Sequence, residues 1–179
     1  IEEVAIFPQG YAALMTEVGL LQDEPSMLLM DLGGWTVDLM RIDNTIPAAD
    51  TAHSLELGMI RCVDDIREQV RRETGLSLTD AQIENMLAGQ PCTVSDTVRD
   101  IVKRQGRKYT EHLLSATMEA GFDLHALPAV LLGGGASVVS RHLSPKDGLC
   151  TTLFLLDDKV NAVGFERALT AVSRRKSEA

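Results

Sequence analysis

The sequence has few cysteines, no clustered histidines and no long apolar run. The three cysteines, Cys62, Cys92 and Cys150, lie far apart and form no CxxC pair, which favours a reducing, cytoplasmic compartment over a disulfide framework. The four histidines show no ligand spacing, so a metal cage of histidine and cysteine is not expected. No apolar run approaches the roughly 20 residues of a membrane span, and no signal-peptide pattern is present.

Positive charge is also in short supply. The chain has 17 Lys and Arg against 26 Asp and Glu, which gives a net charge of -9 and a pI of about 4.9. We therefore expect no direct binding to nucleic acid, and the acidic surface gives no indication of membrane association. With 179 residues, of which 45% are hydrophobic, the sequence is long enough for one globular domain or one and a half.

The spacing of apolar residues predicts an α/β chain. Strands are expected at residues 3–7, 27–32, 36–43, 51–58, 129–132 and 151–156. Helices are expected at residues 8–15, 58–70, 79–89, 95–121, 137–143 and 157–172. Thr79 and Gln82 form a possible capping box for the third of these helices. The loop 44–50 is expected between two of three consecutive strands, which form a meander.

The segment DLGGWTVD, residues 31–38, joins two predicted strands through two glycines and has a carboxylate at each end. A Gly-Gly pair can serve turn geometry alone. Glycines also let backbone N–H groups approach an anion, and successive amides form a concave nest for phosphate, to which Thr36 could add a hydroxyl donor. Asp31, at the end of a buried strand, is costly without a partner. A hydrated Mg²⁺, held with help from Asp38 through water, would supply that partner.

A second glycine turn, AVLLGGGASVV at residues 129–139, leads from a buried strand into a helix. It has neither the GxGxxG fingerprint of dinucleotide-binding folds nor the lysine of a Walker loop, and a turn of this kind can also serve packing alone. Gly133, Gly134 and Gly135 would let a purine and its ribose lie directly on the backbone. Together, the two turns indicate a nucleotide with its phosphates at one turn and its base at the other.

Four segments in order resemble the actin-like ATPase superfamily, which includes actin, the sugar kinases and the heat-shock chaperone ATPases. DLGGWTVD is similar to its second phosphate motif and AVLLGGGASVV to its adenosine motif, while IFPQGYAALM and DKVNAVGFERAL are similar to its two connecting helices. These segments span nearly the whole chain. Pro8-Gln9 before a small-residue helix, the aromatic Trp35 and the compact insertion most resemble the ParM/StbA group of plasmid-segregating bacterial actins.

The resemblance implies the fold of a ribonuclease H-like lobe, with a mixed sheet flanked by helices and a small helical insertion. Residues 1–75 and 109–179 would form the core subdomain, and residues 76–108 the insertion. This superfamily's sites have two lobes, and the phosphate loop of the first lobe, an Asp followed by glycines and commonly a Lys, is not found in this sequence. We therefore expect the chain to correspond to the second lobe, or to a natural half-length protein, with little or no ATP hydrolysis alone.

The resemblance also implies roles for individual residues. Asp31 would be catalytic by holding the hydration shell of Mg²⁺, and Asp38 would assist through water. The nucleotide, ATP or GTP, would be bound chiefly by the backbone of Gly33, Gly34, Trp35 and Thr36 at the phosphates and of Gly133, Gly134, Gly135 and Ala136 at the adenosine. Gln9 would position the attacking water, because an amide orients water although it is a poor base. Without the resemblance, Gln9 is a helix-start residue facing solvent.

Two features have a plain structural alternative. Trp35 replaces the small residue that is more usual in the motif, and its indole would cover the site, plug a neighbouring cavity or simply pack in the core. The two connecting helices would cross closely, either as a hinge between lobes or as ordinary helix packing. The small residues at that crossing would be Gly10, Ala12, Ala13, Ala162 and Gly164.

Three functions are consistent with these residues. The first is the C-terminal lobe of a ParM-like ATPase that self-associates into nucleotide-dependent filaments, with plasmid DNA contacted only through a DNA-binding adaptor protein. The second is a small-molecule kinase or chaperone-like ATPase, although neither a sugar-binding constellation nor a substrate-binding domain is recognisable. The third is an assembly module that retains the fold without turnover. Nucleotide-dependent light scattering of the full-length protein would separate them.

Overall fold

The structure is a computed structural model that describes residues 8–14, 16–17, 19, 24–157 and 159–177. The strand predicted at residues 3–7 lies outside the described residues. Among the described residues, no helix is both long enough and apolar enough to cross a bilayer.

One five-stranded mixed sheet forms the centre of the molecule, in the order β3-β2-β1-β4-β5. Three strands form the predicted antiparallel meander: β1 (Ser26–Leu32), β2 (Val37–Asp43) and β3 (Ile46–Leu55). On the other side of β1 lie β4 (Ala129–Leu132) and then β5 (Thr152–Leu155), both parallel to their neighbours. The α/β class and the mixed sheet are therefore confirmed.

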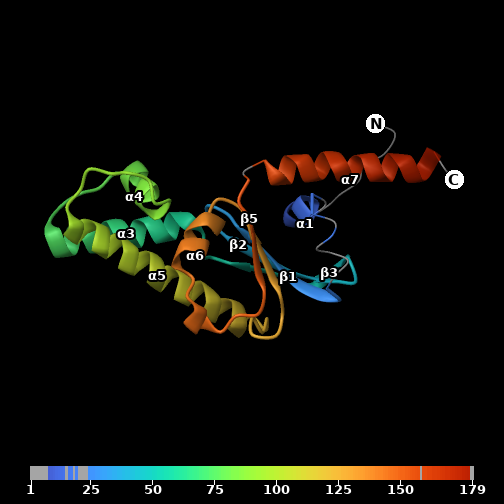
Figure 1. Ribbon diagram of the computed structural model, residues 1–179, viewed down its shortest axis with the longest axis horizontal. Helices are drawn as coiled ribbons and strands as arrows, with labels where there is room; N and C mark the ends of the chain where they lie inside the picture. Colours follow the sequence, from blue (N-terminus) through green and yellow to red (C-terminus); the bar gives the residue numbers. More distant parts are fainter. Residues whose placement is uncertain (1–7, 15, 18, 20–23, 158, 178–179) are drawn as a thin grey trace.

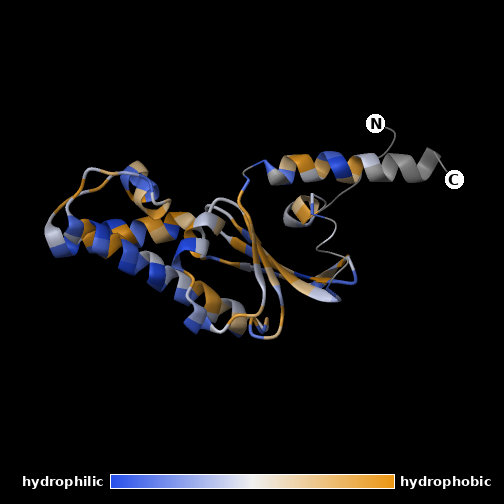
Figure 2. Ribbon diagram, viewed as in Figure 1, coloured by the Kyte–Doolittle hydropathy of each residue, from blue (hydrophilic) through white to orange (hydrophobic). Residues whose placement is uncertain are grey.

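Helices cover both faces of this sheet (Figure 1). One face packs against α3 (Met59–Thr74), α5 (Asp96–Glu119) and α6 (Ala136–His142), and the other packs against α1 (Gln9–Leu14). Strand β1 serves both layers because its side chains alternate: Leu28 and Met30 belong to the larger core, and Met27 and Leu29 to the smaller one. This two-sided burial explains why β1 reads as a continuous apolar run, which is visible as orange ribbon in Figure 2.

The region predicted as an insertion contains α4 (Asp80–Leu87), which lies beside α3 and α5 and away from the sheet (Figure 1). Its N-terminus has the predicted capping box, since Thr79 accepts from the backbone N–H of Gln82 and the Gln82 side chain accepts from the N–H of Thr79. Helix α5 is continuous across residue 108, so the predicted boundary falls within a helix. The division into core and insertion stays a prediction.

The loop predicted at 44–50 is wrong, because the turn consists only of Asn44 and Thr45 and β3 begins at Ile46. Both turn residues have positive φ, 48° and 70°, as in a two-residue hairpin turn with the twist that antiparallel strands favour. Pro47 suggested a loop, but β3 is an edge strand, where a missing N–H removes no ladder hydrogen bond. The turn sets the first pairs of β2 with β3, and a register shift between Leu39 and Arg41 then brings Ser54 opposite Asp38.

The helices α1 and α7 (Val160–Ser177) cross in close contact, as their small residues predicted. We expect Gly164→Ala to lower the midpoint of thermal unfolding, because the added Cβ would lie 1.8 Å from the carbonyl oxygen of Ala12. The gain in helix propensity, about 1 kcal/mol, is smaller than the cost of forcing the helices apart, about 1–3 kcal/mol or more. Glu166→Ala, at an exposed position of the same helix, is the control. Equal melting of both variants would contradict the close crossing.

Candidate functional site

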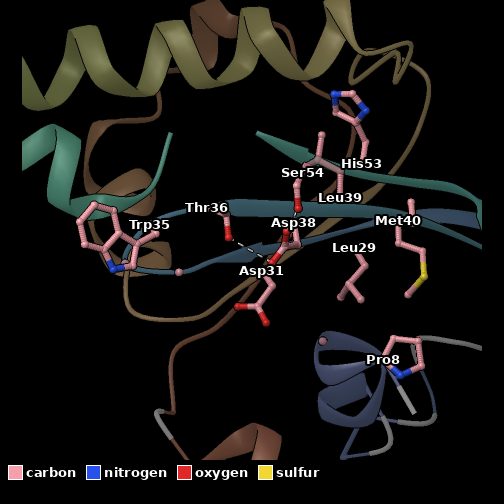
Figure 3. Close-up of a pocket in the computed structure, with 14 residues that line it drawn as sticks. Pro8, Leu29, Asp31, Trp35, Thr36, Asp38, Leu39, Met40, His53 and Ser54 are labelled. Carbon is pink, nitrogen blue, oxygen red and sulfur yellow. Dashed lines mark hydrogen bonds between the residues drawn. The ribbon is translucent and has the colours of Figure 1, made fainter. Parts of the chain in front are cut away.

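Three polar side chains lie in a row across neighbouring strands. Asp31 of β1 pairs with Asp38 of β2, and Asp38 pairs in turn with Ser54 of β3. Residues directly opposite one another in a sheet project from the same face, and Figure 3 shows these three side chains gathered at one cavity. Asp31 is the second-last residue of β1, whose carboxyl end lies beside that of the parallel strand β4. Ligands of open α/β sheets commonly bind at that edge.

The two carboxylates have different environments. Asp38 is exposed and accepts hydrogen bonds from the hydroxyls of Ser54 and, at 3.4 Å, Thr36. Asp31 is half-buried, and no group among the described residues donates a hydrogen bond to it. Burial, and then the negative charge of Asp38, raise the pKa of Asp31. A partly desolvated carboxylate without a donor and with a second carboxylate beside it is suited to a cation.

The turn between β1 and β2 is fixed by hydrogen bonds to the start of α3, and three of its backbone N–H groups are unpaired among the described residues. The Gly33 N–H donates to the Thr36 carbonyl at 2.9 Å, and the carbonyls of Gly33 and Gly34 accept from the first residues of α3. Within the described part of the chain, the N–H groups of Gly34, Trp35 and Thr36 have no acceptor. Successive unpaired amides at such a turn form an anion-binding concavity.

Gly58 supports this turn and was missed at the sequence level. Its N–H donates to the Trp35 carbonyl at 3.0 Å, and a Cβ at this position would lie 2.4 Å from the Gly34 carbonyl oxygen. The glycine follows β3 and precedes α3, far along the chain from the turn it contacts. A glycine in the segment HSLELGM gives no sequence signal for this contact.

The second glycine turn meets the first one at Asp31. A Cβ on Gly133, whose φ is +85°, would lie 2.7 Å from Oδ1 of Asp31. The Gly135 N–H donates to the Leu32 carbonyl at 3.1 Å, and Ala136 begins α6. A Cβ added to Gly134 would have no atom within 4 Å, so the backbone there faces open space. The sequence prediction that the two turns act together is consistent with this contact.

Two cavities adjoin the turns and share Gly33 and Gly34 in their walls. The first has a volume of about 720 Å³ and contains the row of Asp31, Asp38 and Ser54 (Figure 3). The second has a volume of about 320 Å³ and lies between the turns and the helices, with Gly134 and Glu84 of α4 in its wall. The turn that contains Gly33 and Gly34 thus separates a carboxylate-lined space from a more apolar one.

Most of the site residues predicted from the sequence line one of these two cavities. Asp31, Asp38, Gly33, Gly34, Trp35 and Thr36 line the first cavity, and Gly134 lines the second. Trp35 is 78% exposed, which excludes packing in the core, and its indole points away from the carboxylates in Figure 3. Gln9 is the first residue of α1, but its side chain lies outside the described part of the structure.

Sequence reasoning missed Ser54, His53 and Glu84, which line the cavities. Each is separated from both glycine turns along the chain, and Ser54 and His53 reach the site only through the pairing of β2 with β3.

A divalent cation fits the first cavity only if it keeps much of its own water. Among the described residues, no group of three or more His, Cys, Asp or Glu side chains could enclose a metal. Two neighbouring carboxylates, Asp31 and Asp38, are what a hydrated Mg²⁺ typically uses together with phosphate oxygens. The donor set therefore fits Mg²⁺ better than a fully protein-coordinated ion.

Comparison with known proteins gives similarity at the level of structure alone. No family model and no curated protein matches the sequence. Among solved structures, Ta0583, an archaeal actin homolog, matches with a TM-score of 0.72 and 16% identity over 92% of this chain and 55% of that chain. Its complex with ADP matches with a TM-score of 0.67 and 17% identity over 96% of this chain and 58% of that one.

These matches define the class: the chain has the actin-like ATPase fold. Structures of ParM are among the similar ones, and a non-polymerisable quadruple mutant of pCBH ParM matches with a TM-score of 0.64 and 19% identity, over 90% of this chain and 52% of that chain. The fold is therefore consistent with a ParM-type protein. The chain spans about half the length of the solved structures that it matches.

Proposed function

We propose that this chain forms one lobe of an ATP-binding site that uses Mg²⁺. The observation that carries the proposal is the meeting of the two glycine turns at Asp31, where Gly133 lies against the Asp31 carboxylate. A phosphate nest, a carboxylate pair and a second open glycine turn within one contiguous region are the parts that a nucleoside triphosphate requires. Each part alone has a structural explanation, whereas their juxtaposition favours a nucleotide.

The β- and γ-phosphates would lie at the open amides of Gly34, Trp35 and Thr36. Asp31 and Asp38 would hold the water shell of Mg²⁺, which supplies charge neutralisation at the phosphates when bound. The adenosine would lie on Gly133 to Ala136, next to the 320 Å³ cavity, and the carboxylate of Glu84 in the wall of that cavity would accept from a ribose hydroxyl. ATP and GTP differ in hydrogen-bonding groups at the base, which this backbone contact does not distinguish.

Hydrolysis would require groups that face this lobe from the other side of the nucleotide. The carboxylate-lined cavity opens to solvent at Trp35 and Ser54, so the lobe alone does not exclude water from the phosphates. The whole protein would be the ATPase, with Gln9 orienting the attacking water. Phosphoryl transfer depends on positioning and electrostatic stabilisation from all sides, so we expect little turnover by these 179 residues alone.

We further propose that the whole protein self-associates into nucleotide-dependent filaments that segregate plasmid DNA. Similarity to ParM structures supports this function, including one described as a non-polymerisable mutant. The net charge of -9 disfavours direct contact with DNA, so a DNA-binding adaptor protein would make that contact.

Two measurements test these proposals separately. Titration of the chain with ATP in Mg²⁺, and again in EDTA, should give saturable binding that weakens without the metal. Light scattering of the full-length protein should rise with ATP and differ with ADP. Absence of ATP binding at millimolar concentration would overturn the site. ATP binding without any polymer would support the proposed ATP site and overturn the proposal that the protein forms filaments.

Ser54 offers a finer test, because it positions Asp38 rather than contacting the nucleotide. Ser54→Ala removes the hydroxyl that donates to Asp38, so the carboxylate becomes less fixed. We expect the Mg²⁺ dependence of ATP binding to shift to roughly three- to tenfold higher metal concentration, the effect of losing about 1 kcal/mol of hydrogen bonding. Ser54→Thr should restore the affinity, and Ser140→Ala, on α6, should leave it unchanged. An unchanged metal dependence in Ser54→Ala would contradict the positioning role.

A further inference from the structure

A third kind of cavity lies away from both glycine turns, where the end of α4 meets α5 and α6. Its volume is about 350 Å³. Met86, Leu87 and Val102 give it an apolar floor, and Arg99, Lys103 and Arg141 give it three cationic side chains. We call it the basic cavity.

The basic cavity differs in charge from the other described cavities. The cavity at the phosphate turn contains Asp31 and Asp38, and the one beside Gly134 contains Glu84. A smaller one between α3 and α5, of about 240 Å³, contains Asp65 beside Arg61 and Lys108. No carboxylate lines the basic cavity among the described residues. The protein has a net charge of -9, so its surface is acidic on average. A cavity whose charged side chains are all cationic departs from that average.

Two of its three cations have no ion-pair partner in the described structure. Arg99 pairs with Asp96 at 2.9 Å and also donates to the Cys92 carbonyl. Arg141 and Lys103 have no carboxylate within 4.0 Å among the described residues, whereas most other arginines near them are paired: Arg104 with Glu73, and Arg107 with Glu111 and Asp147. Two cationic side chains on the cavity wall are therefore not compensated by a carboxylate of the described residues.

The guanidinium of Arg141 lies directly against the turn that ends α4. A Cβ at Gly89, where φ is +70°, would lie 2.6 Å from a terminal nitrogen of Arg141. The imidazole ring near the cavity, that of His142, is already engaged, because its Nδ1 lies 2.8 Å from the Val138 carbonyl oxygen. Contact with Gly89 therefore holds Arg141 on the cavity wall, and its guanidinium can still donate hydrogen bonds to a ligand. His142 has one ring nitrogen fewer to offer a ligand, because Nδ1 is already paired.

We propose that the basic cavity binds a small organic molecule that carries a phosphoryl group. A phosphoryl dianion accepts several hydrogen bonds at once, which suits a guanidinium fork together with an ammonium point charge. The apolar floor would contact the carbon part of the molecule, and a volume of about 350 Å³ is larger than inorganic phosphate alone requires. Leu87 also lines the cavity beside Gly134, but the cations of the basic cavity belong to neither glycine turn, so this site does not depend on the proposed ATP site.

The chain should be titrated with phenyl phosphate and with inorganic phosphate, in EDTA at low ionic strength, by calorimetry. We expect one saturable site, with phenyl phosphate bound more tightly than inorganic phosphate. Arg141→Ala and Lys103→Ala should each weaken phenyl phosphate about tenfold, the loss of a charge-assisted hydrogen bond, and Arg141→Lys should restore part of it. Rising salt should weaken the binding, since the site is open to solvent.

Two control variants test whether the binding is specific to the basic cavity. Arg71→Ala and Arg72→Ala each remove an exposed cation on α3, and both should leave phenyl phosphate binding unchanged. Unsaturable binding, or an equal loss in Arg72→Ala, would overturn the proposal in favour of general charge attraction. Unchanged binding in both Arg141→Ala and Lys103→Ala would also overturn the proposal. The cations would then serve only to offset the partial negative charge of carbonyls at the helix ends. Lys103, on the exposed surface of α5, keeps the test valid if Arg141→Ala does not fold.

Discussion

Asp31→Asn should lower Mg²⁺-dependent ATP hydrolysis by the protein that carries this chain about 10²-fold or more, the usual effect of removing one electrostatic stabiliser. Asparagine keeps the shape of the side chain and loses the charge. The half-buried carboxylate has no donor among the described residues, and its proposed partner is the hydration shell of Mg²⁺. A neutral amide would leave only Asp38, which is exposed and already accepts two hydroxyl hydrogen bonds.

The same substitution should stabilise the nucleotide-free chain slightly. Burial and the charge of Asp38 raise the pKa of Asp31, so the folded state binds its proton more tightly than the unfolded state does. Its effect on folding is therefore absent below the unfolded pKa and becomes a penalty as the pH rises through the folded pKa. At neutral pH the wild-type chain bears this penalty and Asp31→Asn does not.

Opposite effects on turnover and on stability distinguish a functional carboxylate from a structural one. We expect Asp31→Asn to melt at the same temperature as the wild type or a degree or two higher, a change of roughly 0.5 kcal/mol, while its turnover collapses. Asp50→Asn, at an exposed position of β3, is the matched control and should change neither. A variant that keeps full turnover, or that loses turnover only because it unfolds, would contradict the assigned role of Asp31.

The sequence was sufficient for those parts of the site that lie within one contiguous segment. The two glycine turns, the strands that lead into them and the capping box of α4 were all predicted, because each depends on residues a few positions apart. The pairing of Asp31 with Asp38 follows from a turn of four residues between β1 and β2. Local chemistry and strand geometry determine these features directly.

The remaining parts depend on contacts between distant segments. The pairing of β2 with β3 starts at the two-residue turn and then shifts register between Leu39 and Arg41, which places Ser54 opposite Asp38. The expected seven-residue loop left this pairing undefined. Gly58 reaches the turn between β1 and β2 only because β3 ends and α3 begins beside that turn. Trp35 is exposed although a single tryptophan suggests a core residue. In these cases tertiary packing determines where the side chain lies, and composition and local sequence do not.

Gly133→Ala should be among the most damaging substitutions for folding, whereas Gly134→Ala, one residue away, should hardly affect it. At Gly133 the positive φ of +85° costs an alanine about 1–2 kcal/mol, and its Cβ would lie 2.7 Å from both Asp31 Oδ1 and the Leu32 carbonyl oxygen. Together these terms predict a loss of at least about 2 kcal/mol, or roughly 4–8 °C in Tm. At Gly134 nothing lies within 4 Å, so stability should stay within about 0.5 kcal/mol.

The value of this pair lies in what Gly134→Ala does to nucleotide binding. The open space above Gly134 is where the base and ribose would lie, so a methyl group there should weaken ADP at least tenfold in calorimetry while Tm is unchanged. Gly19→Ala, at an exposed glycine that belongs to neither turn and has no atom within 4 Å of its Cβ position, controls for the nucleotide effect. If Gly134→Ala binds ADP as the wild type does, the adenosine does not lie on this turn, and the phosphate turn must act without it. If both Gly134→Ala and Gly133→Ala fold normally, the contact between the two glycine turns at Asp31 is itself wrong, and with it the juxtaposition on which the nucleotide site depends.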